Sequence, residues 1–191
     1  MNDSCAAGLA VALVHHPVVD KNGDTIAAAV TALDLHDIAR VSKTYGVAPF
    51  YVVTPLEDQQ TLVRQIVGHW VTGAGAKYNP DRQAALELIR LKASLADAQA
   101  EMAAAVGKRP RVVVTSARME NSDLSYAALG EMVRNRHPVL LVFGTAWGLA
   151  PEVMSAADYR LDPINGRGEY NHLAVRSAVS IILDRMLGDI G

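Results

Sequence analysis

Short apolar runs alternate along this chain with longer stretches in which apolar residues recur every three or four positions. Leu9–Val14, Phe50–Val53 and Val139–Phe143 are continuous apolar runs, typical of strands covered on both faces. Leu88–Lys92 and Arg111–Thr115 have weaker strand patterns. The intervening stretches have helical spacing, so strands and helices are predicted to alternate.

Start and stop signals support the predicted helices. Thr54-Pro55-Leu56-Glu57 is interpreted as a capping box, with Thr54 as N-cap, and Ser94 with Asp97 opens another helix. Asn171 is predicted to cap the most apolar helix, and the Gly-rich stretch Thr72–Asn79 is predicted as a loop. The expected helices are Leu35–Tyr45, Thr54 to about Val71, Pro80 to about Leu86, Ser94 to Gly107, Leu124–Asn135 and Asn171–Leu187.

Alternating strands and helices favour an α/β fold with a mostly parallel sheet and helices on both faces. The chain has 191 residues and no internal repeat or linker composition, so residues 1–191 are expected to form a single domain.

Composition and charge narrow the function classes. Lys and Arg total 18 against 20 acidic residues, a net charge of −2, so no global positive field attracts nucleic acid. A local excess of basic residues could serve RNA or be ordinary surface charge: Lys108, Arg109, Arg111, Arg118, Arg134 and Arg136, against Glu120, Asp123 and Glu131.

Cys5 is the only cysteine, so no disulfide can form within the chain, which fits a reducing cytoplasm. The apolar stretch Ala6–Val14 lacks a basic n-region and is interpreted as a first strand rather than a signal peptide. No apolar run approaches the roughly 18 residues of a membrane helix. No metal-binding spacing of His, Cys and carboxylates occurs, so we expect neither a membrane nor a metal partner.

Two loops are candidates for ligand binding, because parallel sheets bind ligands beyond the carboxyl ends of their strands. Phe143–Leu149 follows the strongest strand, and its two glycines allow close approach of a ligand. The alternative is a tight turn with Trp147 packed beneath it. Leu161–Gly166 and Tyr170–Leu173 precede the last helix, where free amides could bind an acceptor. There the alternative is N-capping by Asn171, with His172 in the first turn.

Three segments together resemble the SPOUT methyltransferases: Leu35–Val47, Val139–Leu149 and Asp162–Leu187. The similarity covers nearly the whole chain and is closest to a small stand-alone bacterial branch with the motifs FGTAWGL and NHLAVRSA. It implies a SAM-dependent RNA methyltransferase acting on tRNA or rRNA, at a ribose 2′-oxygen or a base nitrogen. It also implies a deep C-terminal trefoil knot and a homodimer whose active site is completed across the interface.

The resemblance also implies roles for individual residues. Arg40 would bind RNA phosphate or polarise the acceptor; the alternative is a surface or interface arginine paired with Asp37 or another acidic residue. Leu35, His36 and Asp37 stand where the family usually has Asn-x-Gly, and Ala146 replaces an expected glycine. The S-adenosylmethionine pocket would use Thr115, Phe143, Gly144, Thr145, Gly148, Leu161, Pro163, Ile164, Asn171, His172 and Leu173.

Two other functions remain open at this stage. A SPOUT-fold RNA-binding module with weak or lost catalysis is favoured by the even charge balance and the missing Asn-x-Gly. A nucleotide-binding oxidoreductase would share the α/β pattern, but the chain lacks the G-x-G-x-x-G fingerprint of that class.

Overall fold

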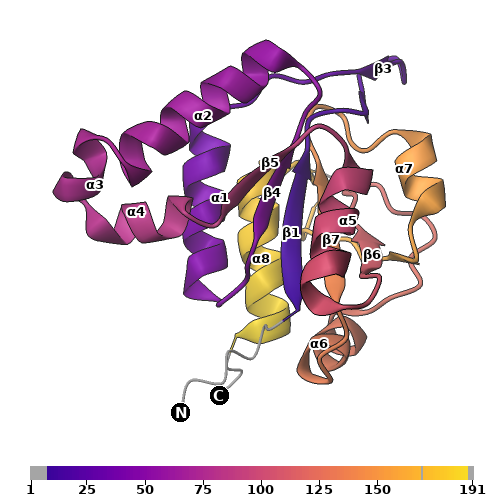
Figure 1. The fold of residues 1–191 in the computed structure, drawn as a ribbon. Coiled ribbons are helices and arrows are strands. Elements are labelled where there is room, and N and C mark those ends of the chain that lie inside the picture. The colour runs from indigo at the N-terminus through magenta and orange to yellow at the C-terminus, as the bar shows by residue number, and fades with distance from the viewer. Residues whose placement is uncertain (1–7, 169, 189–191) are drawn as a thin grey trace.

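The computed structural model describes residues 8–168 and 170–188. Six strands form one sheet in the order β5–β4–β1–β7–β6–β8, and all neighbouring strands are parallel (Figure 1). The predicted α/β class with a mostly parallel sheet is therefore confirmed. The strands are β1 (Leu9–Val14), β4 (Phe50–Val53), β5 (Ile89–Lys92), β6 (Arg111–Val114), β7 (Val139–Gly144) and β8 (Tyr159–Arg160).

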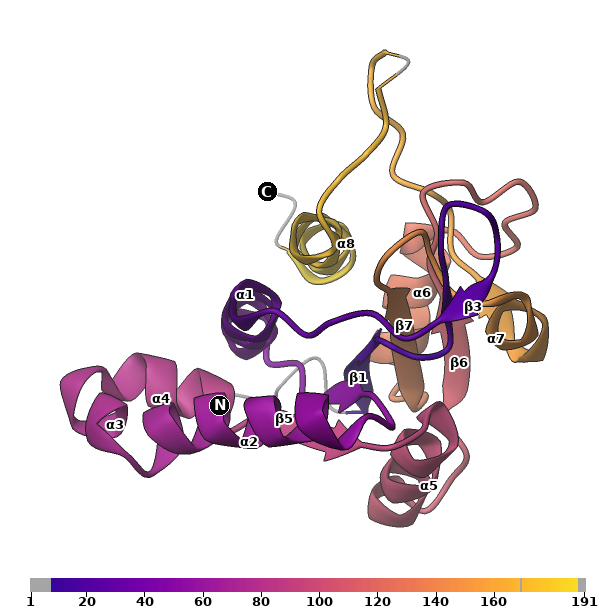
Figure 2. The ribbon, with the colours of Figure 1, turned by 90° about the horizontal axis from the view of Figure 1, so that it is seen from above.

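Helices cover both faces of the sheet (Figure 2). In β1, Leu9 and Leu13 belong to the core on one face, while Ala10 and Ala12 belong to the core on the other. The first face is covered by α1 (Ala32–Thr44), α2 (Glu57–Val71), α4 (Pro80–Leu86), α6 (Tyr126–Arg134) and α8 (Val175–Leu187). The opposite face is covered by α5 (Leu95–Val106) and α7 (Pro151–Ala156).

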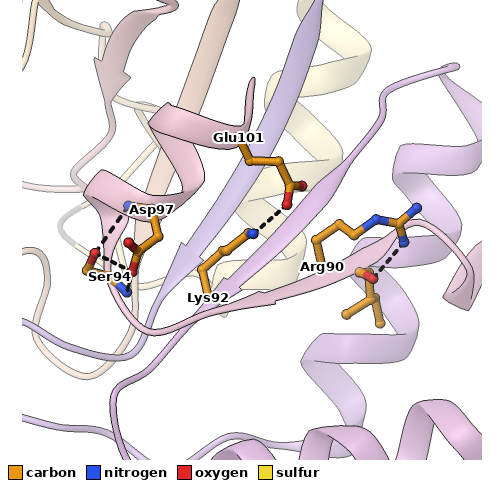
Figure 3. A network of polar contacts seen from close by, with 6 residues as sticks. Arg90, Lys92, Ser94, Asp97 and Glu101 are labelled. Atoms are coloured by element: carbon orange, nitrogen blue, oxygen red, sulfur yellow. Dashed lines mark hydrogen bonds and ion pairs between the residues drawn. The ribbon is translucent and has the colours of Figure 1, made fainter. Parts of the chain in front are cut away.

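The predicted start of α5 is confirmed. Ser94 Oγ accepts a hydrogen bond from the Asp97 amide at 3.1 Å, and Asp97 Oδ2 accepts one from the Ser94 amide at 3.0 Å (Figure 3). Lys92 at the end of β5 forms an ion pair with Glu101 of α5. These contacts fix the turn from the edge strand into the helix.

The predicted capping box at Thr54 is wrong. The N-cap of α2 is Leu56, and no side chain caps the helix. Thr54 is fully buried at the end of β4, and its carbonyl oxygen accepts a hydrogen bond from Gln60 Nε2 at 2.9 Å. The loop predicted at Thr72–Asn79 is also partly wrong, because it contains the short helix α3 (Ala74–Tyr78).

The predicted cap at Asn171 is wrong as well. Helix α8 begins at Val175 after the N-cap Ala174, and residues 165–168 and 170–174 belong to an arm that projects away from the sheet (Figure 2). Helix α6 begins at Tyr126, two residues later than expected, because Leu124 bridges to Leu161. Neither α7 nor β8 was predicted, nor was the β2 (Val18–Val19) and β3 (Thr25–Ile26) hairpin, although its turn at Asp20–Asp24 contains an Asn-Gly pair.

Cys5 and the start of the apolar stretch Ala6–Val14 lie outside the described residues. Among the described helices, none is long and apolar enough to cross a membrane. The described residues contain no group of three or more His, Cys, Asp or Glu that could hold a metal ion.

Candidate functional site

The carboxyl ends of three neighbouring strands bring most of the candidate residues together. Strands β7, β6 and β8 are adjacent and parallel, so the loops after them leave the same edge of the sheet. The Thr115 amide donates to the Val142 carbonyl at 3.1 Å, and the Leu161 amide donates to the Val114 carbonyl at 3.0 Å. Thr115, Gly144 and Leu161 therefore lie side by side.

The loop after β7 turns tightly at its glycines. A Cβ on Gly144 would lie 2.6 Å from the Leu149 amide nitrogen, so a side chain there cannot be accommodated without moving backbone. Gly148 has φ +121°, and a Cβ there would have no neighbour within 4 Å. Ala146, where a glycine was expected, has φ +50°. The loop is therefore tight against the protein at Gly144 and open at Gly148.

Hydrogen bonds tie this loop to the end of β1. Both the amide and the hydroxyl of Thr145 donate to the Val14 carbonyl, at 3.2 and 3.0 Å. The Trp147 ring does not pack beneath the turn, because Trp147 is 55% exposed. The guanidinium carbon of Arg118 lies 5.4 Å from the Trp147 ring centroid and so joins the β6 and β7 loops. The sequence analysis counted Arg118 only within the local excess of basic residues and did not place it at the strand-end loops.

The segment after β8 is held by Tyr126, which sequence reasoning also missed. The Tyr126 hydroxyl donates to the Asp162 carbonyl at 2.9 Å. Burial raises the pKa of Tyr126, while the neighbouring Arg185 acts in the opposite direction, so the phenol stays protonated as a donor. Pro163 and Ile164 are half-buried beside this anchor.

Two candidate residues contribute no side-chain surface. Phe143 is 1% exposed and Leu161 is fully buried, and both belong to the core on the α8 side. Only their main-chain atoms are suited to contact a ligand.

The structure does not bring the third candidate segment to the glycine loop. Asn171, His172 and Leu173 lie on the projecting arm (Figure 2). His172 has an edge contact with Tyr170, with ring centroids 6.3 Å apart, and Leu173 is 43% exposed. In the described part of the chain, no hydrogen bond joins these residues to the loop after β7.

Arg40 is exposed on α1 and does not pair with Asp37. Asp37 instead forms an ion pair with Arg176 of α8, with Arg176 Nε 3.3 Å from Asp37 Oδ2, and the same guanidinium lies 3.4 Å from the buried Asp34. Within the described residues Arg40 forms no ion pair, so its charge is available. A groove of about 470 Å³ between α1 and α8 runs beside Arg40 and is lined by Arg176, Ser177 and Ser180.

Arg40 is also distant from the strand ends. Helix α1 starts at the carboxyl edge of the sheet and runs back toward the start of β4. Arg40 is eight residues beyond Ala32, which places it about 12 Å down the helix at 1.5 Å per residue. Within one chain, therefore, Arg40 and the strand-end loops do not form one site.

His15 is the fully buried residue that follows β1, between the ends of β4 and β7. Neither ring nitrogen has a partner with good hydrogen-bond geometry among the described residues, although the backbone of Ala28 and Ala29 lies close enough to act on the ring. Burial lowers the pKa of His15, and the negative charge of Asp34 only partly opposes this effect, so the ring is neutral at pH 7.

Comparison with known proteins agrees with this geometry. A family model described as a SAM-dependent RNA methyltransferase matches residues 8–188. An uncharacterized protein from Aquifex aeolicus is 38% identical over 92% of this chain and 86% of its own length. The match favours a methyltransferase over both the oxidoreductase and the non-catalytic binding module.

Two further similarities concern a longer relative and a solved structure. A tRNA (guanine-N(1)-)-methyltransferase from Oleidesulfovibrio alaskensis is 46% identical over 93% of this chain. The chain spans only 41% of the length of that relative. The SpoU methyltransferase AviRb from Streptomyces viridochromogenes, solved with AdoMet, superposes with a TM-score of 0.57 at 18% identity, over 95% of this chain and 57% of that one. The fold is thus that of the SPOUT methylases.

Proposed function

Because the chain belongs to the SAM-dependent RNA methyltransferase family, we propose that it methylates tRNA or rRNA, at a ribose 2′-oxygen or a base nitrogen. The observation that carries the proposal is the adjacency of Thr115, Gly144 and Leu161 at the ends of three neighbouring strands. That edge is where α/β sheets bind their ligands.

The residues at this edge fit S-adenosylmethionine. The open side of Gly148 leaves room for a ligand against main chain, and Thr115 and Thr145 stand at the base of the loops. Pro163 and Ile164 supply half-buried apolar surface for the adenosine. Gly144 and the main chain of Phe143 and Leu161 complete this side of the proposed pocket.

The remaining cofactor residues lie on the arm. We infer that Asn171, His172 and Leu173 close over the cofactor when the arm folds back toward Gly148. His172 and Leu173 are exposed, and the 43% accessibility of Leu173 supports a second position in which its apolar side chain is covered.

The bound cofactor supplies an activated methyl group, and this chain has to align the acceptor with it. Arg40 is the residue proposed to hold the RNA phosphate beside the acceptor or to polarise the acceptor. Its guanidinium is always protonated, so it acts by charge and hydrogen bonding rather than as a base.

The distance of Arg40 from the strand ends supports a homodimer in which Arg40 of a second copy completes the site. We further propose that residues 1–191 form one domain with the deep trefoil knot of the SPOUT class. An RNA substrate also favours a cytoplasmic location. The name of the longer relative supports tRNA as the substrate, although its activity belongs to a chain of which this one spans 41%.

The proposal is tested by calorimetry with S-adenosylhomocysteine and by transfer of labelled methyl groups from S-adenosylmethionine to total RNA. Wild-type protein is expected to bind the cofactor product and to label tRNA or rRNA. Arg40→Ala is expected to keep cofactor affinity but lose turnover on the order of 100-fold. Arg64→Ala, an exposed arginine on α2, serves as the control. Absence of cofactor binding by the wild-type protein contradicts the proposal.

Sedimentation tests the dimer separately. If Arg40 of a second copy completes the site, an inactive Arg40→Ala chain and an inactive strand-end variant should regain activity when they are mixed. A monomer at micromolar concentration, or mixed chains without recovered activity, contradicts the shared site.

A further inference from the structure

A second groove lies on the other side of Arg40, between α1 and α4. It has a volume of about 330 Å³ and is lined by Arg40, Lys43, Asp81 and Arg82, with Asn79 at its end. Three cations thus face one carboxylate in a space that can admit a ligand. Helices α2, α3 and α4 extend beyond the edge of the sheet, so the groove opens on a part of the molecule separate from the strand-end loops (Figures 1 and 2).

The cations of this groove are not neutralised by the protein. In the part of the chain that the structure describes, Arg40, Lys43 and Arg82 have no ion pair with a carboxylate. Because three unpaired cations and one carboxylate line the same groove, the groove has a net positive charge that can bind an external anion.

Arg82 is held in place by an aromatic neighbour. Its guanidinium carbon lies 4.5 Å from the centroid of the Trp70 ring, and its Nε is buried without a hydrogen-bond partner. Trp70 is itself fixed, because His36 packs edge-on at 5.5 Å and a Cβ on Gly75 would lie 2.7 Å from the indole. The arginine is therefore preorganised, which lowers the entropy lost when it binds a ligand.

The positive charges of Arg40 and Arg82 both act on a neighbouring side chain, His36. Burial lowers the pKa of His36, and the positive charges of Arg82 and Arg40 lower it further. A neutral His36 adds no charge of its own at pH 7. The positive potential of the groove thus comes from permanently charged arginines and Lys43.

One exposed aromatic residue is the sequence neighbour of a residue that lines the groove. Tyr78, the last residue of α3, is 85% exposed and directly precedes Asn79 of the groove lining. An exposed ring beside a cationic groove is the combination with which proteins bind single-stranded nucleic acid, by stacking bases and neutralising phosphates.

We propose that the groove between α1 and α4 binds the phosphate backbone of an unpaired stretch of the substrate RNA, with a base stacked on Tyr78. Lys43 and Arg82 neutralise phosphates on the side of Arg40 that faces away from α8. This inference rests on the proposed RNA substrate and adds to it the position and the single-stranded character of the bound segment.

Fluorescence anisotropy with a short, labelled single-stranded oligoribonucleotide tests the groove across a range of salt concentrations. For single strands, each lost phosphate contact reduces the slope of log affinity against log salt by about 0.7, which is about fivefold in affinity per tenfold change in salt. Lys43→Gln and Arg82→Gln are each expected to cause a loss of this size. Arg64→Gln, an exposed arginine on α2 that does not line the groove, is the matched control and should bind like wild type.

Tyr78 provides an independent arm of the test. Tyr78→Ala is expected to weaken binding of the single strand by at least about fivefold, whereas Tyr78→Phe keeps the stacking surface and the affinity. A fully paired RNA hairpin stem should bind more weakly than the single strand. Thermal unfolding verifies that each variant is folded, and the exposed Lys43 keeps the test valid if Arg82→Gln is unstable.

Several outcomes overturn the inference. Unchanged affinity and salt slope in Lys43→Gln, equal binding of the paired stem, or equal competition by polyglutamate each exclude an RNA-specific groove; the last result assigns it to acidic proteins. Calorimetry with S-adenosylhomocysteine separates this failure from failure of the proposed function. Cofactor binding without RNA binding at the groove rejects only the groove, while loss of both in the wild-type protein rejects the methyltransferase itself.

Discussion

Gly144 shows how much a single missing side chain can determine at the strand ends. The sequence identified the position as a glycine after a strong strand, and the structure adds the reason for it. The Leu149 amide nitrogen lies 2.6 Å from the place of a Cβ, with the Gly148 carbonyl carbon at 2.9 Å. These two nearest neighbours are backbone atoms, which cannot move aside as a flexible side chain can.

Gly144→Ala is therefore expected to lower the free energy of unfolding by about 1–3 kcal/mol, because the added methyl group overpacks the turn. Affinity for S-adenosylhomocysteine should fall with it, since the loop must shift. Urea unfolding and calorimetry measure the two effects. Gly168→Ala is the control, because a Cβ there has no neighbour within 4 Å. Equal stability of the two variants would be inconsistent with the close approach.

At the scale of elements, the helix starts show which of the capping patterns in the sequence form in the structure. Ser94 and Asp97 form the reciprocal hydrogen bonds of a capping box, whereas Thr54 and Glu57, at the same spacing, do not. Thr54 is drawn into the buried end of β4, so the helix starts only after it. The tertiary demand for a buried strand end outweighs the local capping preference.

The two positions give a matched prediction. Asp97→Ala should destabilise the protein by about 1 kcal/mol, because it removes half of a capping box. Glu57→Ala should change stability by no more than about 0.5 kcal/mol, because Glu57 caps nothing. Chemical unfolding of both variants at the same pH compares them directly. A larger loss of unfolding free energy for Glu57→Ala would show that Glu57 does take part in capping α2.

Particular elements explain what the sequence could and could not predict. The strands β1, β4 and β7 were predictable because each is a continuous apolar run, and their parallel order placed the strand-end loops together. Helix α7 and strand β8 were missed because they are short and lack a clear period. The partner of Asp37 could not be found locally either, since Arg176 lies in the last helix.

Stability against pH is a property of the whole molecule to which the buried His15 contributes. Its folded pKa lies below the ordinary value of 6.5, so between the two values the unfolded chain binds more protons than the folded one. The contribution of the neutral His15 to stability is therefore fully present above about pH 7, and it is lost as the pH drops through 6.5. His36, whose pKa burial also lowers, acts with the same sign.

His15→Leu is expected to flatten this dependence, because it removes the group whose protonation favours unfolding. One histidine can contribute a slope of at most about 1.4 kcal/mol per pH unit. Urea unfolding between pH 7.5 and 5 measures the change in the free energy of unfolding per pH unit. The proteins compared are wild type, His15→Leu and His137→Gln, in which an exposed histidine is replaced as a control. A slope in His15→Leu as steep as that of the wild-type protein contradicts the assignment.

The place of β1 in the sheet has a consequence for synthesis on the ribosome. Every residue of β1 pairs with β7, from Leu9 with Val139 to Val14 with Gly144, although most of the chain separates the two strands. At usual elongation rates, β1 emerges on the order of ten seconds before its partner has been made. During that interval one edge of β1, a strand made only of apolar residues, has no neighbouring strand to pair with. Nascent chains of this protein should therefore depend on chaperone cover until β7 has left the exit tunnel, and truncated chains that end before Val139 should aggregate.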